Sequence, residues 1–296
     1  MSVLPQDGRR ASGPSTPFGV LFLLAFLAGL GIFAAQLWNG RSYYLTPLAE
    51  RPRHEQYWAL KPGGSHGLVF GTAGLAMMTV MHVYSARKRM PALRGLGPLA
   101  RWLDFHILLG VFGPLFVVLH SSFKVGGLVA VSFWAMVAVA LSGVIGRYLY
   151  RQIPRTRAGE ALSLAETQAA ARDLGRRLHE EFGLDAALLD PVEEEKRPRG
   201  LLPALAHVLW QDVSGAQRRR LRARTAGLAL PAKDRRELRA VLAQKGALDR
   251  RLALWDELHG LFDWWHVVHK PFAIVMYVFV VVHVGVAVAT GYAWAR

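Results

Sequence analysis

The chain contains 296 residues, of which 52% are hydrophobic and 19% are charged, and its formal net charge is +15. Soluble domains have about 45–50% apolar and about 25% charged residues, so this composition indicates membrane-spanning segments joined to a soluble part. The sequence has no cysteine, which excludes disulfides, thiolate zinc sites, protein-bound Fe–S clusters, covalently attached c-type haem and cysteine nucleophiles. A metal site in this chain must therefore use its 11 histidines or its carboxylates.

Five stretches of the sequence carry no charged residue, and they lie at 17–40, 62–86, 105–123, 125–146 and 271–295. A helix needs about 20 apolar residues to cross the hydrocarbon core of a bilayer. We therefore predict an all-α integral membrane protein, a five-helix transmembrane bundle with helices at about 18–39, 66–86, 102–123, 127–150 and 263–291. The first stretch is too long for a cleaved signal peptide and lacks the small-residue cleavage site of one.

The charged residues are concentrated between the fourth and fifth of these helices. Residues 151–263 contain 21 of the 36 basic residues and 17 of the 21 acidic residues. This distribution predicts three parts: transmembrane helices in 1–150, a soluble helical insert in 151–262, and the fifth transmembrane helix with a short outer tail in 263–296. Because the acids lie almost entirely in the insert, the basic excess belongs mainly to the membrane flanks, and nucleic acid is not an expected partner.

The Lys and Arg residues near the helix ends predict how the chain is oriented in the membrane. Eleven of them flank the helices on one side, and six flank the other side. The positive-inside rule places the more basic side in the cytoplasm. We therefore predict a multi-pass protein of the inner (cytoplasmic) membrane, with the N-terminus and the insert in the cytoplasm and the C-terminus outside.

The insert has the sequence pattern of three helices. Ser163 and Glu166 have the spacing of a capping box at the start of the first helix. A second helix is predicted at about 203–224, and a third begins near Ala232 and continues almost without interruption into the fifth transmembrane helix. The charged, proline-containing segment 193–200 is a predicted linker. The insert is either a solvated helical hairpin that packs on itself or a docking platform for a cytoplasmic partner.

Six histidines lie in or close to the apolar stretches, and they are His82, His106, His120, His266, His269 and His283. Ionisable side chains in lipid are costly and often mark functional sites. His106 and His120 are 14 residues apart, and so are His269 and His283. Fourteen residues turn an α-helix by about 40° less than four full turns and rise about 21 Å. Both members of each pair therefore share one face of a helix and lie near opposite leaflets.

The predicted topology makes the third and fifth transmembrane helices parallel, because two crossings separate them. His106 and His269 then lie at matching depth near the cytoplasmic side, and His120 and His283 lie at matching depth near the outer side. This arrangement suits two haem groups of the b type, each held by one histidine from each helix, and bis-histidine ligation favours one-electron transfer. Zinc is the weaker alternative, because its ligands form one tight tetrahedral cluster.

The paired H-x13-H spacing in the third and fifth helices resembles the ferric-reductase-like transmembrane cytochrome b family. That family includes ferric reductases, the membrane domain of NADPH oxidases and the haem subunit of the periplasmic methionine-sulfoxide reductase. The resemblance covers about 66–150 and 262–291, and it implies that the four paired histidines are the axial ligands of two haem b groups. The chain departs from the family by its long insert and by lacking the FAD and NAD domain of the self-contained reductases. Electrons are therefore expected from a separate protein or from quinol.

Other residues near these positions are candidates for secondary roles. Arg101, Arg147 and Lys124 lie at membrane boundaries, where they could pair with haem propionates or simply snorkel to the interface. His82 could accept a proton from quinol, ligate a third haem or hydrogen-bond a backbone carbonyl. His266 lies about 100° away from the face of the paired histidines, so an interfacial role is expected for it in preference to ligation.

These observations predict an electron-transfer (oxidoreductase) subunit that is not catalytic alone. It would carry single electrons across the membrane between a cytoplasmic flavin or Fe–S donor, or a larger redox complex docked on 151–262, and an outer-side cytochrome or reductase. The alternative is a quinol-linked membrane reductase subunit that uses the same haem groups, in which case quinone is a second cofactor. A non-redox metal-transport or assembly subunit is the third alternative.

Overall fold

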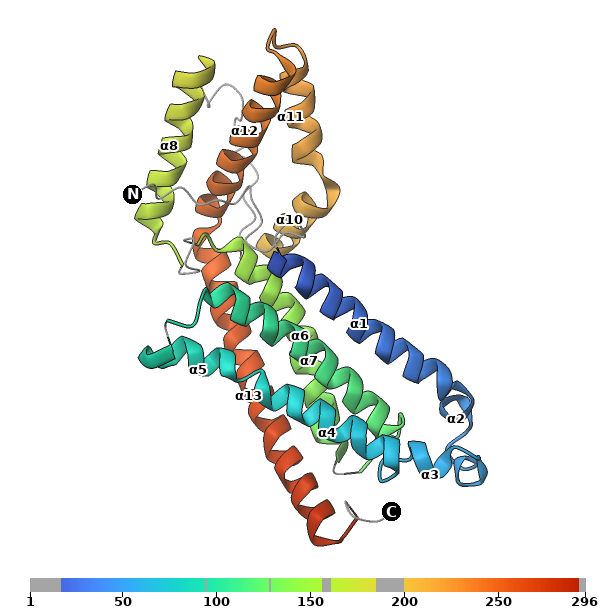
Figure 1. The fold of residues 1–296 in the computed structure, drawn as a ribbon. Coiled ribbons are helices and arrows are strands. Elements are labelled where there is room, and N and C mark those ends of the chain that lie inside the picture. Colours follow the sequence, from blue (N-terminus) through green and yellow to red (C-terminus); the bar gives the residue numbers. More distant parts are fainter. Residues whose placement is uncertain (1–16, 94, 128, 156–160, 185–199, 293–296) are drawn as a thin grey trace. The chain divides into compact units, whose positions relative to one another are not determined.

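The computed structural model describes residues 17–93, 95–127, 129–155, 161–184 and 200–292. Within these ranges the chain is helical and forms no β-strand (Figure 1). In the described part of the chain, five helical spans are long and apolar enough to cross a membrane, which is compatible with the predicted membrane bundle. Residues 193–199 of the predicted linker lie outside the described residues.

The five apolar spans are α1 (Pro17–Asn39), a broken span from Tyr57 to Arg89, α6 (Leu99–Ser121), α7 (Val129–Gln152) and α13 (Trp255–Ala289). The broken span contains α3 (Tyr57–Leu60), α4 (Ser65–Val80) and α5 (Val83–Arg89). The apolar span expected at 66–86 is therefore confirmed, but it is not one continuous helix, because a turn at residues 81 and 82 interrupts it. The expected near-continuity of the third insert helix with the last span is confirmed, because α12 (Ala232–Ala253) ends two residues before α13 begins.

Packing of the backbone divides the chain into two compact units. The bundle unit comprises the described residues of 12–145 and 266–296, and the insert unit comprises residues of 146–265. The division falls inside α7 and inside α13, so each of these helices contributes residues to both units.

The bundle unit is built around α4, α6, α7 and α13. Its buried core between α4, α7 and α13 consists of Met78, Ala135, Met136 and Met276. Two hydrogen bonds tie the same helices together: Ser132 Oγ donates to the Met276 carbonyl at 3.1 Å, and the Tyr277 hydroxyl donates to the Met78 carbonyl at 2.6 Å. These contacts hold the central part of α13 against both α4 and α7.

Glycines let α4 and α6 approach closely. A Cβ atom on Gly74 would lie 2.8 Å from the Gly113 carbonyl oxygen, and a Cβ atom on Gly113 would lie 2.8 Å from Met78 Cγ. Small residues at such positions allow apolar helices to pack backbone against backbone. The contact fixes α6 against α4 midway between the histidines at 106 and 120.

The first helix, α1, packs on α6 through aromatic rings. Phe26 and Phe112 have ring centres 5.3 Å apart, and Phe18 and Phe105 have ring centres 6.0 Å apart. The ring of Phe112 lies directly over Gly29, where a Cβ atom would be 2.7 Å from the ring. Most other side chains of α1 are exposed, as expected for a helix that faces lipid on its remaining sides.

We expect Gly29→Ala to lower the free energy of unfolding by about 1–3 kcal/mol, because the added methyl group would overlap the buried Phe112 ring. Gly31→Ala is the matched control, because a Cβ atom there meets nothing within 4 Å and alanine is the better helix former. Unfolding of both variants in detergent, followed by circular dichroism, measures the difference. Equal stability of the two variants would contradict the packing of α1 on α6.

The segment between α1 and α4 contains α2 (Arg41–Leu45), a 3-10 turn (Arg51–Arg53) and α3, and one buried arginine anchors it. Arg51 is 7% exposed, and its guanidinium donates to the carbonyls of Thr46, Tyr44 and Ser122. Ser122 has a left-handed backbone with φ of 48° and ends α6. Burial raises the pKa of Tyr44 to about 12. The arginine therefore fixes the end of α6 just after the histidine at 120.

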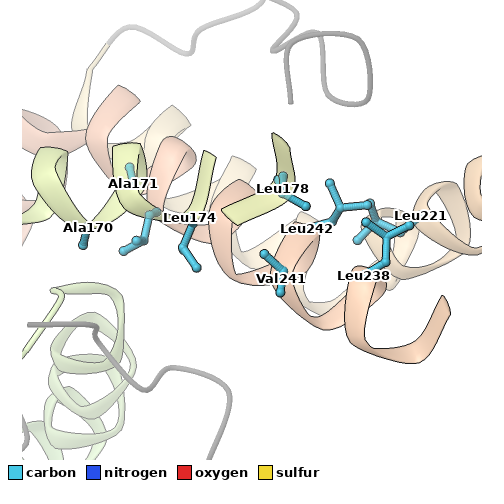
Figure 2. Packing of buried hydrophobic residues seen from close by; sticks show 9 residues of the cluster. Ala170, Ala171, Leu174, Leu178, Leu221, Leu238, Val241 and Leu242 are labelled. Carbon is cyan, nitrogen blue, oxygen red and sulfur yellow. The ribbon is translucent and has the colours of Figure 1, made fainter. Parts of the chain in front are cut away.

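The insert unit contains α8 (Leu164–Phe182), α10 (Leu201–Ser214), α11 (Ala216–Ala226), α12 and the first turns of α13. Its main core lies between α8, α11 and α12 and includes Leu174, Leu178, Leu221, Leu238 and Leu242 (Figure 2). The fully buried members of this core, Leu178 and Leu238, are 0% exposed. The insert unit therefore has a hydrophobic core of its own.

Of two local predictions for the insert, the capping box is present and the single second helix is not. The predicted capping box is confirmed, because Ser163 Oγ accepts from the Glu166 N–H and the Glu166 carboxylate accepts from the Ser163 N–H. These bonds hold the pKa of Glu166 below its usual value. The single helix predicted at 203–224 is wrong, because Gly215 has a left-handed backbone with φ of 61° and separates α10 from α11. Glycine adopts this conformation without the steric cost that other residues incur.

Candidate metal centre

His120 on α6 and His283 on α13 lie close to each other in the bundle unit. Their ring centres are 6.3 Å apart, and the angle between the ring planes is 64°. Two imidazoles that bind one metal ion from opposite sides, each at about 2.0 Å, have ring centres about 6 Å apart. The pair therefore has the separation that a bis-histidine iron site requires.

His106 on α6 and His269 on α13 form the second pair. The two imidazoles are close enough for their charges to interact, and both residues are half-buried. The structure thus brings His120 to His283, and it places His106 within electrostatic range of His269. Because the pairs occur in the same order along both helices, α6 and α13 run parallel.

Both histidines of α13 lie on the face of that helix that turns toward the protein. The less exposed positions include His269, Ala273, Met276, Val280 and His283, which recur every three or four residues and so share one face. Most positions between them are exposed. The helix therefore presents both imidazoles to the bundle and an apolar surface to the opposite side.

Two of the histidines are held by backbone carbonyls through Nδ1. His106 Nδ1 lies 3.1 Å from the Met81 carbonyl oxygen, and His120 Nδ1 lies 2.8 Å from the Gly67 carbonyl oxygen. A carbonyl oxygen only accepts hydrogen bonds, so each Nδ1 carries the hydrogen and donates it. The lone pair of each ring is then on Nε2, which is the arrangement of a histidine that binds a metal through Nε2.

His269 uses a side-chain acceptor to the same effect. Its Nδ1 lies 2.7 Å from Ser142 Oγ, and this hydroxyl donates its hydrogen to the Val139 carbonyl at 2.9 Å. A hydroxyl group has one hydrogen, so Ser142 accepts from the Nδ1–H of His269 and leaves the lone pair on Nε2. Ser142 was not among the predicted site residues, because no sequence spacing connects α7 to the histidines of α13.

The interruption of the second span supplies the acceptor for His106. The chain leaves the α-helix after Val80, turns at Met81 and His82, and resumes as α5. The Met81 carbonyl therefore receives only a long bond of 3.3 Å from the Tyr84 N–H. A carbonyl that lacks its usual helical N–H donor needs another donor. The Nδ1–H of His106 is that donor for the Met81 carbonyl.

Gly71 of α4 makes room for the His120 ring, and Gly67 makes room for the backbone that precedes α4. A Cβ atom on Gly71 would lie 2.6–2.9 Å from atoms of the His120 ring, and a Cβ atom on Gly67 would lie 2.1 Å from the Lys61 carbonyl oxygen. Gly67 and Gly71 form a Gly-x-x-x-Gly pattern one turn apart, which is typical of close packing between apolar helices. This pattern is the sequence signal for the close packing of α4, and it is independent of the histidine spacing.

The three basic residues predicted as propionate partners have other surroundings. The Arg101 guanidinium lies over the Phe18 ring, 5.0 Å from its centre, and the Arg147 guanidinium lies 6.0 Å from the centre of the Tyr150 ring. Lys124 is exposed. Arg101 and Lys124 belong to the bundle unit and Arg147 to the insert unit. A role for them toward propionates stays a prediction.

The two remaining candidate histidines, His82 and His266, lie near the His106–His269 pair. The ring centre of His82 is 5.0 Å from that of Tyr277 on α13, and His82 occupies the turn before α5. His266 is half-buried one turn before His269 and is close enough to interact with it electrostatically. Their roles as a third haem ligand, a quinol site or a secondary contact stay predictions.

The described residues contain no group of three or more His, Cys, Asp or Glu side chains that could hold a metal ion. A pair of imidazoles suits a metal whose four other ligands come from a planar macrocycle, whereas structural zinc takes four protein ligands. The histidine separation and the Nδ1 partners therefore fit haem better than zinc. Comparison with protein-family models, curated proteins and solved structures finds no match to this chain.

Proposed function

We propose that this chain is a di-haem b-type membrane cytochrome of the ferric-reductase-like kind that carries single electrons across the membrane. The observation that supports this most strongly is the shared state of His106 and His120. Each imidazole donates Nδ1–H to a backbone carbonyl of α4 or of the turn that follows it, and so has its lone pair on Nε2. Histidines that bind a metal through Nε2 are held in this tautomer by an acceptor at Nδ1, so the state of these two imidazoles supports metal binding.

The four paired histidines divide into an inner and an outer site in this proposal. His106 and His269 would hold the inner haem, and His120 and His283 would hold the outer haem, about 21 Å apart along the helices. Haem iron with two histidine ligands supplies one-electron chemistry between its ferric and ferrous states. The carbonyls of α4 and the hydroxyl of Ser142 keep the rings in one tautomer and one orientation.

The proposal includes an orientation and two kinds of partner. The excess of Lys and Arg on one side supports a cytoplasmic N-terminus and insert in the inner membrane. The donor is proposed as a separate flavin or Fe–S protein, or a larger redox complex, that docks on the insert, and the acceptor as an outer-side cytochrome or reductase. The quinol-linked subunit stays the alternative.

Electron transfer across vesicles tests the proposed function directly. The haem-loaded protein is reconstituted into liposomes that contain trapped ferricyanide, and dithionite is added outside. Trapped ferricyanide should be reduced at a rate that rises with the amount of protein, and His120→Ala and His269→Ala should each abolish this rise. A rate equal to that of protein-free liposomes would contradict the proposal.

We expect Ser142→Ala to keep two haem groups per chain and to raise one of the two midpoint potentials. Without its acceptor, the imidazole of His269 becomes less basic and stabilises ferric iron less. A tenfold change in this preference corresponds to about 59 mV for one electron, so we expect a shift on the order of tens of mV. A spectroelectrochemical titration measures both potentials.

Ser132→Ala is the control for this substitution. Ser132 lies on the same helix, and its Oγ donates to the Met276 carbonyl without contacting a histidine ring. This variant should leave both midpoint potentials unchanged. Potentials in Ser142→Ala that match those of Ser132→Ala would contradict a role for Ser142 in orienting His269.

A further inference from the structure

One helix of the insert unit exposes an apolar face. On α10 the exposed residues Leu202, Ala206, Leu209 and Trp210 recur at i, i+4, i+7 and i+8, so they lie on one side of the helix. Leu202 is 75% exposed and Trp210 is 72% exposed. Exposed apolar faces of this kind mark surfaces that contact another apolar phase.

The opposite face of α10 packs against the beginning of α13. Ala204 is 0% exposed and packs in a buried cluster with Leu254 and Leu258. Trp264 lies six residues after Leu258, about 9 Å further along α13, and it is 64% exposed. The uncharged stretch of α13 begins at residue 271. The helix therefore lies beside the point where the last apolar span starts.

The C-terminal end of α10 is tied to the end of α7. Asp212 accepts hydrogen bonds from the Tyr148 hydroxyl and from Gln152 Nε2, both at 2.9 Å. Tyr148 and Gln152 lie in the last turns of α7, where the fourth apolar span ends. Contacts at both ends thus hold α10 beside the end of one apolar span and the start of another.

The helix that follows is strongly basic. α11 contains five arginines and no acidic residue, and Arg219, Arg220 and Arg222 are exposed. Basic side chains next to an apolar helix face are typical of helices that lie on anionic membrane surfaces. Tryptophan is also favoured at the membrane–water boundary.

We propose that α10 is an interfacial helix, whose face of Leu202, Leu209 and Trp210 enters the boundary between headgroups and acyl chains in the leaflet at which α13 begins. The exposed arginines at the start of α11 bind anionic headgroups of the same leaflet. Lipid is the occupant because α10 packs beside the start of a membrane-length apolar helix, α13, and is followed by basic residues. The proposal does not depend on the metal centre.

Spin labels on single introduced cysteines test this placement, and the chain suits the method because it has no cysteine of its own. Leu202→Cys and Leu209→Cys are labelled in the full-length protein in liposomes of phosphatidylcholine and phosphatidylglycerol. Val278→Cys, exposed on α13, is the lipid control, and Gln168→Cys, exposed on α8, is the water control. Accessibility to oxygen and to a water-soluble nickel chelate is measured for each label.

Labels at Leu202 and Leu209 should resemble Val278, with accessibility to oxygen several-fold higher than to the nickel chelate, at a depth of about 5–10 Å. Labels that resemble Gln168 would overturn the proposal, because the face would then be in water. Labels shielded from both agents would also overturn it, because a protein partner or a second copy would cover the face.

A change of lipid tests the contribution of the arginines separately. The Leu202→Cys label should lie deeper in liposomes with phosphatidylglycerol than in liposomes of phosphatidylcholine alone. Adding Arg219→Gln and Arg220→Gln should remove this difference. Equal depth in both kinds of liposome with the native arginines would overturn the proposed binding of anionic headgroups.

Discussion

Removing two histidines of the same pair should cost the protein one haem, whereas removing one histidine from each pair should cost it both. His120→Ala with His283→Ala leaves His106 and His269 in place, so one haem b per chain is expected. His120→Ala with His269→Ala leaves each haem with a single axial ligand, so neither keeps its bis-histidine ligation and we expect neither to remain bound through purification. Pyridine haemochrome absorbance, divided by protein concentration, measures the difference between the two double variants.

The comparison between the double variants depends on which histidines pair, and not only on how many remain. His179→Ala in α8 is the control for a histidine outside the bundle unit and should retain two haem groups. Circular dichroism checks that every variant keeps its helical content. Equal haem loss in the two double variants would show that the pairing across α6 and α13 is wrong.

Gly71→Ala should remove the outer haem although no ligand is changed. The added Cβ atom would lie 2.6 Å from His120 Nδ1, the nitrogen that donates to the Gly67 carbonyl. The ring cannot yield freely, because that bond and the neighbouring His283 ring fix its position. We expect a haem content of one per chain and a loss of about 1–3 kcal/mol in the free energy of unfolding.

Gly285→Ala is the matched control for this substitution. Gly285 is exposed two residues after His283, on the other side of α13, and a Cβ atom there meets nothing within 4 Å. This variant should retain two haem groups and the stability of the native chain. If Gly71→Ala also retains two haem groups with an unchanged spectrum, the close approach of α4 to His120 is not required for binding.

The apolar spans could be predicted from the sequence because their signal is long and local. An uncharged run of about 20 residues has few alternatives to a membrane-length helix. The pairing of His106 with His269 and of His120 with His283 followed from two regular quantities, the rise of an α-helix and the number of crossings between helices. The capping box at Ser163 is equally local, because its two partners are three residues apart.

The contacts that orient the histidines could not be predicted in the same way. The acceptors of His106 and His120 are backbone carbonyls. Every residue has one, so no residue type in the sequence indicates which carbonyl accepts the bond. The turn at Met81 has no proline or glycine to signal it, and Ser142 meets His269 only through the packing of α7 on α13. A single glycine in a helical pattern is ambiguous, and so the division of the second insert helix at Gly215 was missed.

The haem content of the native chain tests the central claim most directly. The full-length protein is expressed with sufficient haem supply, purified in detergent and assayed as the pyridine haemochrome, with protein determined by amino-acid analysis. The proposed pairs predict two b-type haem groups per chain and a reduced spectrum typical of bis-histidine ligation. Less than one haem b per chain would contradict the assignment of His106, His120, His269 and His283 as axial ligands.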